Sequence, residues 1–277
     1  MATGFPPVGY RGRAVASPGK ILRGREWGAR LQEAMASEPA ATAAWMERHT
    51  RILKSDRFSR VGLLEVAGQG CYLKLYLAKS PLQKLGFRLG YGRGLHSFDA
   101  AVRMARDAVP VPEPRACLLV PEGMVLLTRA LADAADLRAL WLAVPAAGDA
   151  QRFMSRAGEA LAGLHALGYA HGDCKWSNLL WCGSGYYFVD LEGVRKLRAP
   201  HFPAASPAVG QLRDLARFII DAEELGASAE QLEVFLASYL ADIPLSREQL
   251  VAPLRRLLPP IRERHLRRYR LQPRPLL

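Results

Sequence analysis

His171-Gly172-Asp173-Cys174-Lys175-Trp176-Ser177-Asn178 is the stretch that decides the fold, together with Val189-Asp190 further along the chain. A helical pattern of apolar residues ends near Leu167, just before the octapeptide, and a short apolar strand pattern begins directly after it. A second strand pattern then ends at Asp190. These polar side chains therefore lie in loops at the ends of a short hairpin, where they can converge on one spot.

The pattern H-x-D-x-K-x-x-N, followed by an apolar strand and an Asp, is the catalytic arrangement of phosphotransferases with a protein-kinase-like fold. Phosphoryl transfer needs a carboxylate that orients the acceptor hydroxyl and accepts its proton, which suits Asp173. Mg²⁺ prefers oxygen ligands, so Asn178 and Asp190 are the expected metal ligands. Lys175 would place positive charge beside the transferred group. We expect His171 to brace the loop.

Lys74 is the second candidate, because it lies inside the otherwise apolar strand pattern Cys71–Leu77. In kinase-like folds a lysine on the third strand contacts the phosphates of ATP, so we expect Lys74 to bind ATP. The alternative is an edge-strand lysine that faces solvent. Such a lysine usually pairs with an acid on the following helix. Asp99 is a better candidate for that partner than Asp107, although Asp99 would also suit a helix N-terminus.

Two phosphate-binding motifs are missing from the sequence. Without G-x-x-x-x-G-K-[ST] the chain is not a P-loop enzyme. No G-x-G-x-x-G lies between the first two strand patterns, where Lys54–Ser59 would have to cover the phosphates instead. The run Gly90–Gly94 follows the lysine strand, and we interpret it as a flexible basic loop.

Asp214, in Arg213-Asp214-Leu215-Ala216, suits the acid that holds the backbone of the catalytic loop in this fold; an exposed helix acid is the alternative. Only about two dozen residues separate Asp190 from Asp214, and no A-P-E or long phosphorylatable segment fits between them. Regulated protein kinases need such a segment, so its absence favours a small-molecule or glycan acceptor.

The strand and helix patterns divide the chain. We expect an α+β, protein-kinase-like two-lobed fold, with a small antiparallel-sheet N-lobe over 50–130 and a mainly helical C-lobe over 131–277. A hinge is expected near Thr128–Leu131. Residues 1–49 should form a basic arm, through residue 25, and one helix over Glu26–His49.

Bulk composition limits the partners and the compartment. The net charge of +12 favours an anionic partner, and no nucleic-acid-binding module is visible, so nucleic acid is not expected. No segment approaches the roughly 18 uninterrupted apolar residues of a membrane span, and no signal-peptide pattern opens the chain. The four cysteines form no C-x-x-C pair, so we expect free thiols rather than a zinc site. The expected location is the cytoplasm.

The chain resembles the bacterial lipopolysaccharide kinases, the Kdo and heptose kinases of the inner core. The resemblance covers roughly residues 50–270. Its motifs are Tyr72-Leu73-Lys74, Val109–Pro114, His165–Asp173, Lys175, Asn178, Val189–Gly193 and Asp214–Ala216. It implies a kinase that depends on ATP and Mg²⁺ and phosphorylates a sugar hydroxyl, on heptose or Kdo, of the lipopolysaccharide core glycolipid at the cytoplasmic face of the inner membrane.

Other functions stay open on the sequence alone. Antibiotic and choline-type kinases also carry H-G-D, but they usually have His where Lys175 stands. The alternatives are a small-molecule or protein kinase of the same fold and a non-catalytic pseudokinase scaffold in envelope biogenesis. Residues 254–277 hold eight arginines and one glutamate, which suits peripheral contact with anionic membrane or a solvated terminal helix. We expect a monomer.

Overall fold

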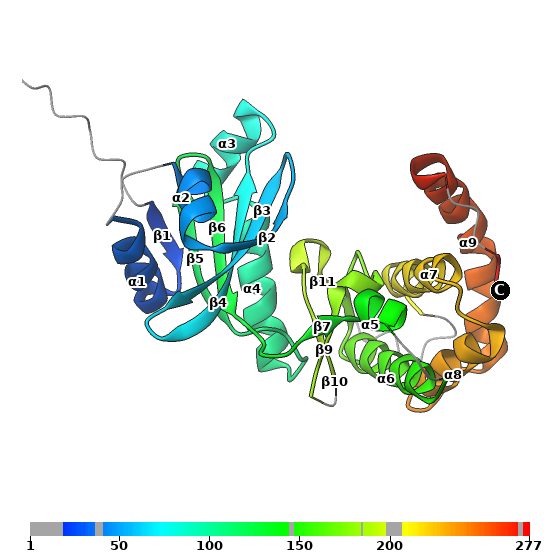
Figure 1. Ribbon diagram of the computed structural model, residues 1–277. Coiled ribbons are helices and arrows are strands. Elements are labelled where there is room, and N and C mark those ends of the chain that lie inside the picture. Colours follow the sequence, from blue (N-terminus) through cyan, green and yellow to red (C-terminus); the bar gives the residue numbers. More distant parts are fainter. Residues whose placement is uncertain (1–18, 37–40, 144–146, 184, 198–206, 271–273) are drawn as a thin grey trace, which may run out of the picture.

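The computed structural model describes residues 19–36, 41–143, 147–183, 185–197, 207–270 and 274–277. They form two lobes, an antiparallel sheet with its helices and a mainly helical lobe (Figure 1). The chain passes between the lobes after Arg129, close to the hinge expected at Thr128–Leu131. Within the described residues, no helix is both long enough and apolar enough to cross a membrane.

The sheet of the first lobe has the strand order β1-β5-β6-β4-β3-β2 among the described residues. Its strands are β1 (Lys20–Arg23), β2 (Arg51–Ser55), β3 (Ser59–Val66), β4 (Gln69–Leu77), β5 (Pro114–Val120) and β6 (Gly123–Arg129). A tight turn at Ala67 and Gly68, both with positive φ, joins β3 to β4. These two strands therefore form an antiparallel hairpin.

Side-chain alternation along β4 decides where Lys74 points. Cys71, Leu73 and Leu75 are fully buried in the core under α1 (Arg25–Ala36) and α2 (Thr42–His49). Because successive side chains alternate between the faces of a strand, Lys74 lies on the opposite face. It pairs across the sheet with Val61 and Leu126, so β4 is a central strand and the edge-strand alternative is wrong.

The N-terminal region differs from its expected form. Lys20–Arg23 does not belong to a free arm, because β1 pairs with β5 at the edge of the sheet. The first 18 residues of the expected arm lie outside the described residues. The helix expected over Glu26–His49 is divided into α1 and α2, and residues 37–40 between them are also outside the description.

The expected flexible loop at Gly90–Gly94 is the junction of α3 (Pro81–Arg88) and α4 (Arg93–Arg106). Ser80 caps α3 by accepting a hydrogen bond from the backbone of Gln83 at 3.2 Å. Gly92 lies so close to the sheet that an added Cβ would stand 2.5 Å from the sulfur of Met124. Packing against β6 therefore fixes this segment, although glycines usually indicate mobility.

Helix α4 belongs to both lobes. Phe98 packs beside Tyr76 and Met124 under the sheet. Ala100, Ala101 and Met104, one turn further on, join the core of the helical lobe. The spacing of these residues gives α4 two apolar faces, which suits a helix between two cores.

The second lobe consists of helices around small strands. Its helices are α5 (Leu137–Ala143), α6 (Ala147–Ala166), α7 (Val209–Glu224), α8 (Ala229–Leu240) and α9 (Arg247–Tyr269). Its strands are β7 (Ala135–Asp136), β8 (Tyr169–Ala170), β9 (Leu179–Cys182), β10 (Gly185–Phe188) and β11 (Arg195–Lys196). The expected hairpin of β9 and β10 is confirmed, and the 3-10 turns η1 (Trp176–Asn178) and η2 (Leu191–Gly193) flank it.

Replacing Leu73 with Ala should lower the free energy of unfolding by about 2–5 kcal/mol, because the fully buried side chain would leave a cavity in the sheet core. Urea denaturation measures the loss. Leu142→Ala is the matched control: its side chain is 64% exposed, so the change should stay within about 0.5 kcal/mol. Equal effects of the two substitutions would contradict the packing described above.

Candidate active site

Asp214 on α7 holds the loop that follows β8. Its buried carboxylate accepts hydrogen bonds from the backbone nitrogens of His171 at 2.5 Å and Gly172 at 2.8 Å, which confirms the expected bracing role. Gly172 has a φ of +85°, and a Cβ there would approach the carbonyl oxygen of Gly193 to 2.5 Å. A glycine is therefore required where this loop meets η2.

His171 joins the same loop to the end of the hairpin. Its ring is buried, and Nε2 donates to the carbonyl of Val189 at 3.0 Å, because a carbonyl can only accept. Burial lowers the pKa of His171 below its usual value, so the ring is neutral at physiological pH. His171 therefore braces the loop as expected and does not point into the cleft as an acid or base.

Asp173 presents a carboxylate between two cations. Its side chain is 46% exposed, and Lys175 Nζ lies 3.0 Å from one of its oxygens. Arg217 Nε, on α7, stands 3.9 Å from the other oxygen. Asn178 Nδ2 donates to the backbone carbonyl of Asp173 at 2.9 Å. This carboxylate is thus accessible to a hydroxyl group in a locally positive field.

A second α7 carboxylate, Asp221, supports this arrangement from behind. It accepts the backbone N–H of Trp176 at 2.8 Å and pairs with Arg217 at 2.7 Å. Burial raises the pKa of Asp221 above its usual value, against the opposing effect of Arg217. Asp221 follows Asp214 by two helical turns on one face of α7, a spacing that could have indicated it in the sequence.

Asp190 follows β10 by two residues and directly precedes η2, with its backbone in the left-handed region at a φ of 61°. This conformation is uncommon for a residue with a side chain and often marks a functional site. Burial would raise the pKa of Asp190, but Lys74 and Lys175 outweigh it and lower that pKa overall. The carboxylate is therefore ionised and available to a cation.

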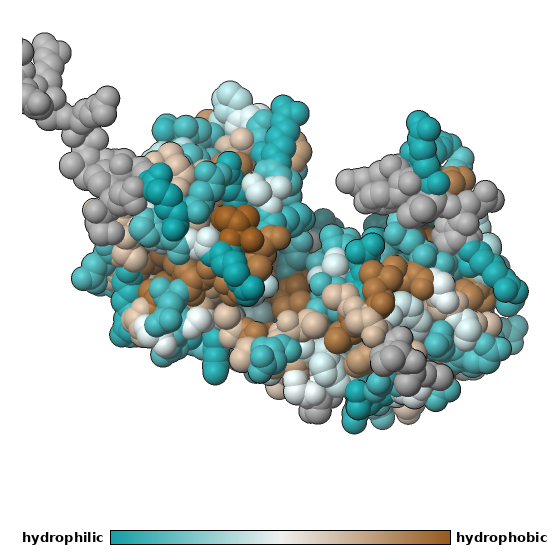
Figure 2. Space-filling model, in the orientation of Figure 1, coloured by the Kyte–Doolittle hydropathy of each residue, from teal (hydrophilic) through white to brown (hydrophobic). Residues whose placement is uncertain are grey.

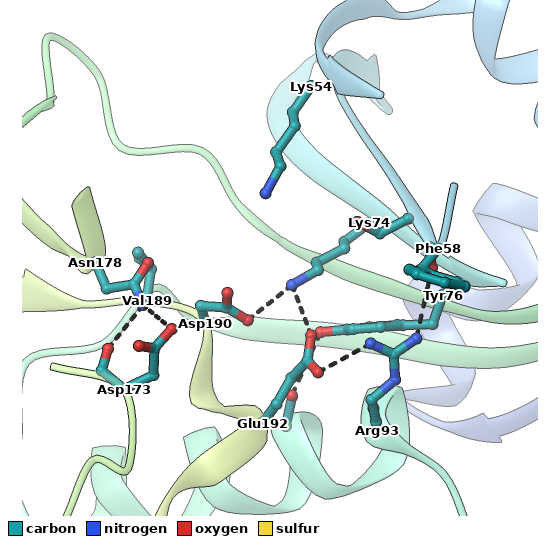
Figure 3. A network of polar contacts seen from close by, with 12 residues as sticks. Lys54, Phe58, Lys74, Tyr76, Arg93, Asp173, Asn178, Val189, Asp190 and Glu192 are labelled. Atoms are coloured by element: carbon teal, nitrogen blue, oxygen red, sulfur yellow. Dashed lines mark hydrogen bonds and ion pairs between the residues drawn. The ribbon is translucent and has the colours of Figure 1, made fainter. Parts of the chain in front are cut away.

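Lys74 crosses the space between the lobes. Its Nζ lies 2.7 Å from Asp190 and 2.9 Å from Glu192, as Figure 3 shows. Arg93, at the start of α4, reaches the other oxygen of Glu192 at 3.2 Å. Burial alone would lower the pKa of Lys74, but the field of Tyr76, Asp190 and Glu192 raises it overall, so the ammonium stays charged.

The expected pairing of Lys74 with Asp99 is wrong. Asp99 accepts a hydrogen bond from Arg23 Nε at 3.0 Å, on the side of α4 that faces β1. Asp107, the other acid considered, pairs with Lys196 and Tyr169. The acid beside Lys74 is Glu192, and α4 contributes the cation Arg93 to this contact.

A cleft of about 1070 Å³ lies between the lobes, and Figure 2 shows the surface hollowed there. The segment 128–131 lines it, as do Lys74, Lys175, Asn178 and Asp190. Lys54, on β2, also lines this cleft and extends toward Lys74 and Asp190 (Figure 3). The turn after it is closed by Asp56, which accepts the backbone N–H groups of Phe58 and Ser59 at 2.8 Å.

Six residues were predicted to take part in catalysis or in binding of ATP and metal. Asp99 is the exception among them, and the structure brings the other five together: Lys74, Asp173, Lys175, Asn178 and Asp190. Sequence reasoning missed Glu192, Arg93, Arg217 and Asp221. Glu192 stands two residues after Asp190 inside a motif already noted, so a second carboxylate at that spacing was the available signal. Arg93 carried no signal, because it lies among glycines in a stretch interpreted as a loop.

Comparisons with known proteins bear on the family and the fold of this chain. The model of the lipopolysaccharide kinase (Kdo/WaaP) family matches residues 43–239. A solved structure described as WaaP in complex with acyl carrier protein is similar, with a TM-score of 0.54 and 19% identity, covering 84% of this chain and 94% of that chain. The kinase domain of PknI from Mycobacterium tuberculosis, solved as a point mutant, gives a TM-score of 0.41 and 17% identity, covering 63% of this chain and 71% of that chain. No curated protein matches the chain. The expected kinase-like fold is confirmed.

Stability should depend on pH through His171. An unfolded histidine has a pKa of about 6.5 and the folded one a lower value, so the unfolded state binds the proton first as the pH falls. Part of the free energy of unfolding is therefore present above about pH 6.5 and is lost below it. Urea denaturation between about pH 7.5 and pH 5.5 measures this loss.

His171→Gln is the matched variant, because its amide can still donate to the Val189 carbonyl but does not titrate. The destabilisation that it causes should shrink as the pH falls. Parallel profiles for the two proteins would contradict a buried neutral histidine.

The pair of Arg93 and Glu192 should show energetic coupling. In a double-mutant cycle with Arg93→Met and Glu192→Gln, the coupling energy should be about 0.5–3 kcal/mol, because the two side chains are partly buried and in direct contact. The exposed pair of Arg30 and Glu26 on α1 is the control and should couple by less than about 0.5 kcal/mol. Equal coupling in the two pairs would show that Arg93 and Glu192 do not hold each other.

Proposed function

Because the chain belongs to the lipopolysaccharide kinase (Kdo/WaaP) family, we propose that it transfers the γ-phosphoryl group of ATP to a hydroxyl group of heptose or Kdo in the lipopolysaccharide inner core. One observation carries this proposal: Lys74 of the sheet lobe meets Asp190 of the helical lobe at 2.7 Å, beside the loop that presents Asp173. A phosphate-binding cation, a metal-binding carboxylate and an acceptor-orienting carboxylate would then share one cleft.

The cleft suits a nucleotide whose base lies at the hinge. Val61, Leu126 and Leu180 supply apolar lining, and the backbone of 128–131 lies at the same edge. The α- and β-phosphates would then contact Lys74, which keeps its charge. Lys54 would cover the phosphates from β2, with a charged side chain where other kinases use glycine backbone.

In the transfer step, the acceptor hydroxyl oxygen forms a bond to the γ-phosphorus, and the bond from phosphorus to the β,γ-bridging oxygen breaks. The hydroxyl proton passes to the Asp173 carboxylate and later to water, and ADP leaves. Lys175, 3.0 Å from Asp173, would offset charge on the transferred group. Arg217 would hold a negative group of the acceptor, such as a sugar carboxylate, from the other side.

The donor set near Asp190 fits Mg²⁺. The amide N–H of Asn178 donates a hydrogen bond to the backbone carbonyl of Asp173, so Oδ1 of Asn178 remains available to a metal. Mg²⁺ typically takes one or two carboxylates and completes its shell with waters and substrate phosphates, so Asn178 and Asp190 suffice. Bound there, the ion would neutralise charge on the β- and γ-phosphates.

The proposed location of the protein follows from its proposed acceptor. We propose that the protein acts in the cytoplasm, as a monomer, at the inner face of the membrane that carries the unfinished glycolipid. Lipopolysaccharide core is anionic, which suits a chain with a net charge of +12.

Asp173→Ala should lower the rate of phosphoryl transfer by about 10²- to 10⁴-fold, because the acceptor hydroxyl loses its orienting base. The melting temperature should not change, since the side chain is half exposed. The assay follows label from ATP into dephosphorylated lipopolysaccharide core, with free sugars and a protein mixture as competing acceptors.

Asp99→Asn is the control, because Asp99 contacts Arg23 and lies away from Lys74, and it should leave turnover unchanged. Near-normal turnover of Asp173→Ala would refute the mechanism. Label that enters only protein, or only free sugars, would refute the assigned acceptor.

A further inference from the structure

Helix α3 carries an apolar face that nothing in the described chain covers. Leu82, Leu85 and Leu89 are 78%, 51% and 66% exposed, and Tyr91 directly after them is 75% exposed. Within the described residues, eleven large apolar residues are exposed, and these four of them lie within ten positions of the sequence. Single exposed leucines are normal on protein surfaces, but such a group indicates a binding surface.

The position of this face is fixed by packing on the opposite side of the helix. At 100° per residue, the three leucines share a sector about 60° wide. Phe87 projects away from that sector and is buried against Met124 and Tyr76. The Ser80 cap and the close approach of Gly92 to Met124 hold the two ends of the segment. The leucines therefore face outward because α3 is anchored.

The charges that this segment itself carries have one sign. Lys79, Lys84 and Arg88 are exposed on the same segment, and no Asp or Glu occurs from residue 66 to residue 98. A second copy of α3 would meet these cations with like charge. Residues 1–18 of the same chain are an equally poor match, since they carry Arg11 and Arg13 and no acid. The complementary surface is apolar beneath an anionic layer, which describes a phospholipid membrane.

A second basic element lies on the same side of the molecule. In Figure 1, α3 and the last turns of α9 rise in the same direction, on either side of the hollow between the lobes seen in Figure 2. Arg264 and Arg267 are exposed on those turns, and the apolar side chain of Leu266 between them is partly exposed. A flat anionic surface could thus contact both elements.

We propose that α3, with Leu89 and Tyr91, docks the protein on the surface of an anionic phospholipid membrane. The leucines insert among the acyl chains, and Lys79, Lys84 and Arg88 contact the phosphate headgroups. The inference deepens the proposed function, because it brings the cleft to a membrane that holds a glycolipid acceptor. Its physical basis is nevertheless independent of catalysis.

Vesicle sedimentation without nucleotide tests the proposal on the full-length protein. Wild type should bind vesicles that contain phosphatidylglycerol and should bind pure phosphatidylcholine vesicles much more weakly. The variant Leu82→Ser with Leu89→Ser should weaken binding at least about tenfold, because two inserted side chains are lost. The variant Lys84→Ser with Arg88→Ser should weaken it about fivefold for each charge. Leu142→Ser, at an exposed leucine on α5, is the matched control and should bind as wild type does.

Insertion has its own readout. Leu85→Trp should show fluorescence that brominated lipids quench more than they quench the fluorescence of the wild type. Absence of vesicle binding by wild type, full binding by the double leucine variant, or equal quenching would overturn the proposal. Loss of self-association, or of binding to an acidic protein, in the leucine variant with vesicle binding intact would assign α3 to that partner instead.

Activity separates this inference from the proposed function. The double leucine variant should phosphorylate a water-soluble core oligosaccharide at the wild-type rate and lose transfer only to acceptor embedded in vesicles. If wild type binds vesicles but phosphorylates neither acceptor, the proposed function fails while the membrane surface stands. If the leucine variant transfers equally well to both acceptors, docking through α3 is not what presents the substrate.

Discussion

The contact of Lys74 with the carboxylates of Asp190 and Glu192 is the constraint on which the arrangement of the two lobes depends. It joins residues 116 and 118 positions apart in the chain, at 2.7 and 2.9 Å. A charged lysine on a central strand is costly to bury, and two acids from the other lobe offset that cost. Arg93 completes the set by neutralising Glu192 from α4. The sheet, α4 and the end of the hairpin are therefore held in one electrostatic network.

On the helical side, α7 holds the loop rigid. Asp214 and Asp221 accept backbone N–H groups on either side of Asp173, so the loop needs no regular secondary structure of its own. His171 adds the connection to the Val189 carbonyl, next to Asp190. The groups that hold the loop are buried, and Asp173 is half exposed. The Asp173 carboxylate is therefore accessible while the residues that position it are shielded from water.

The sequence allowed the fold and most of the candidate site to be predicted for identifiable reasons. Asp173, Asn178 and Asp190 lie in loops that flank a two-stranded hairpin, so local spacing already brings them together. Lys74 was predictable because a lysine is rarely buried among apolar strand residues unless it pairs with an opposite charge or a ligand. The fold class is confirmed by the comparisons, and the roles of these residues stay predictions.

The errors have a common physical origin in long-range contacts. Which acid meets Lys74 depends on how α4 is rotated, and that rotation is set by Phe98 and Met104 packing into two different cores. Asp99 consequently faces β1. This strand was not predicted, because the basic composition of residues 1–25 indicated an arm. Similarly, the glycines around α3 indicated mobility because the sequence does not show that Met124 lies against Gly92.

Strand β1 also has a consequence for how the folded unit is delimited. It is one of the two edge strands of the described sheet and covers the edge of β5, and Arg23 connects it to α4 through an ion pair with Asp99. The family match begins at residue 43, well after this strand. A shortened chain that starts there would leave the backbone N–H and C=O groups of β5 unpaired at an open edge, which invites sheet-to-sheet association between molecules. A recombinant chain would therefore have to begin before residue 20, so that β1 is retained and the protein does not associate through the edge of β5.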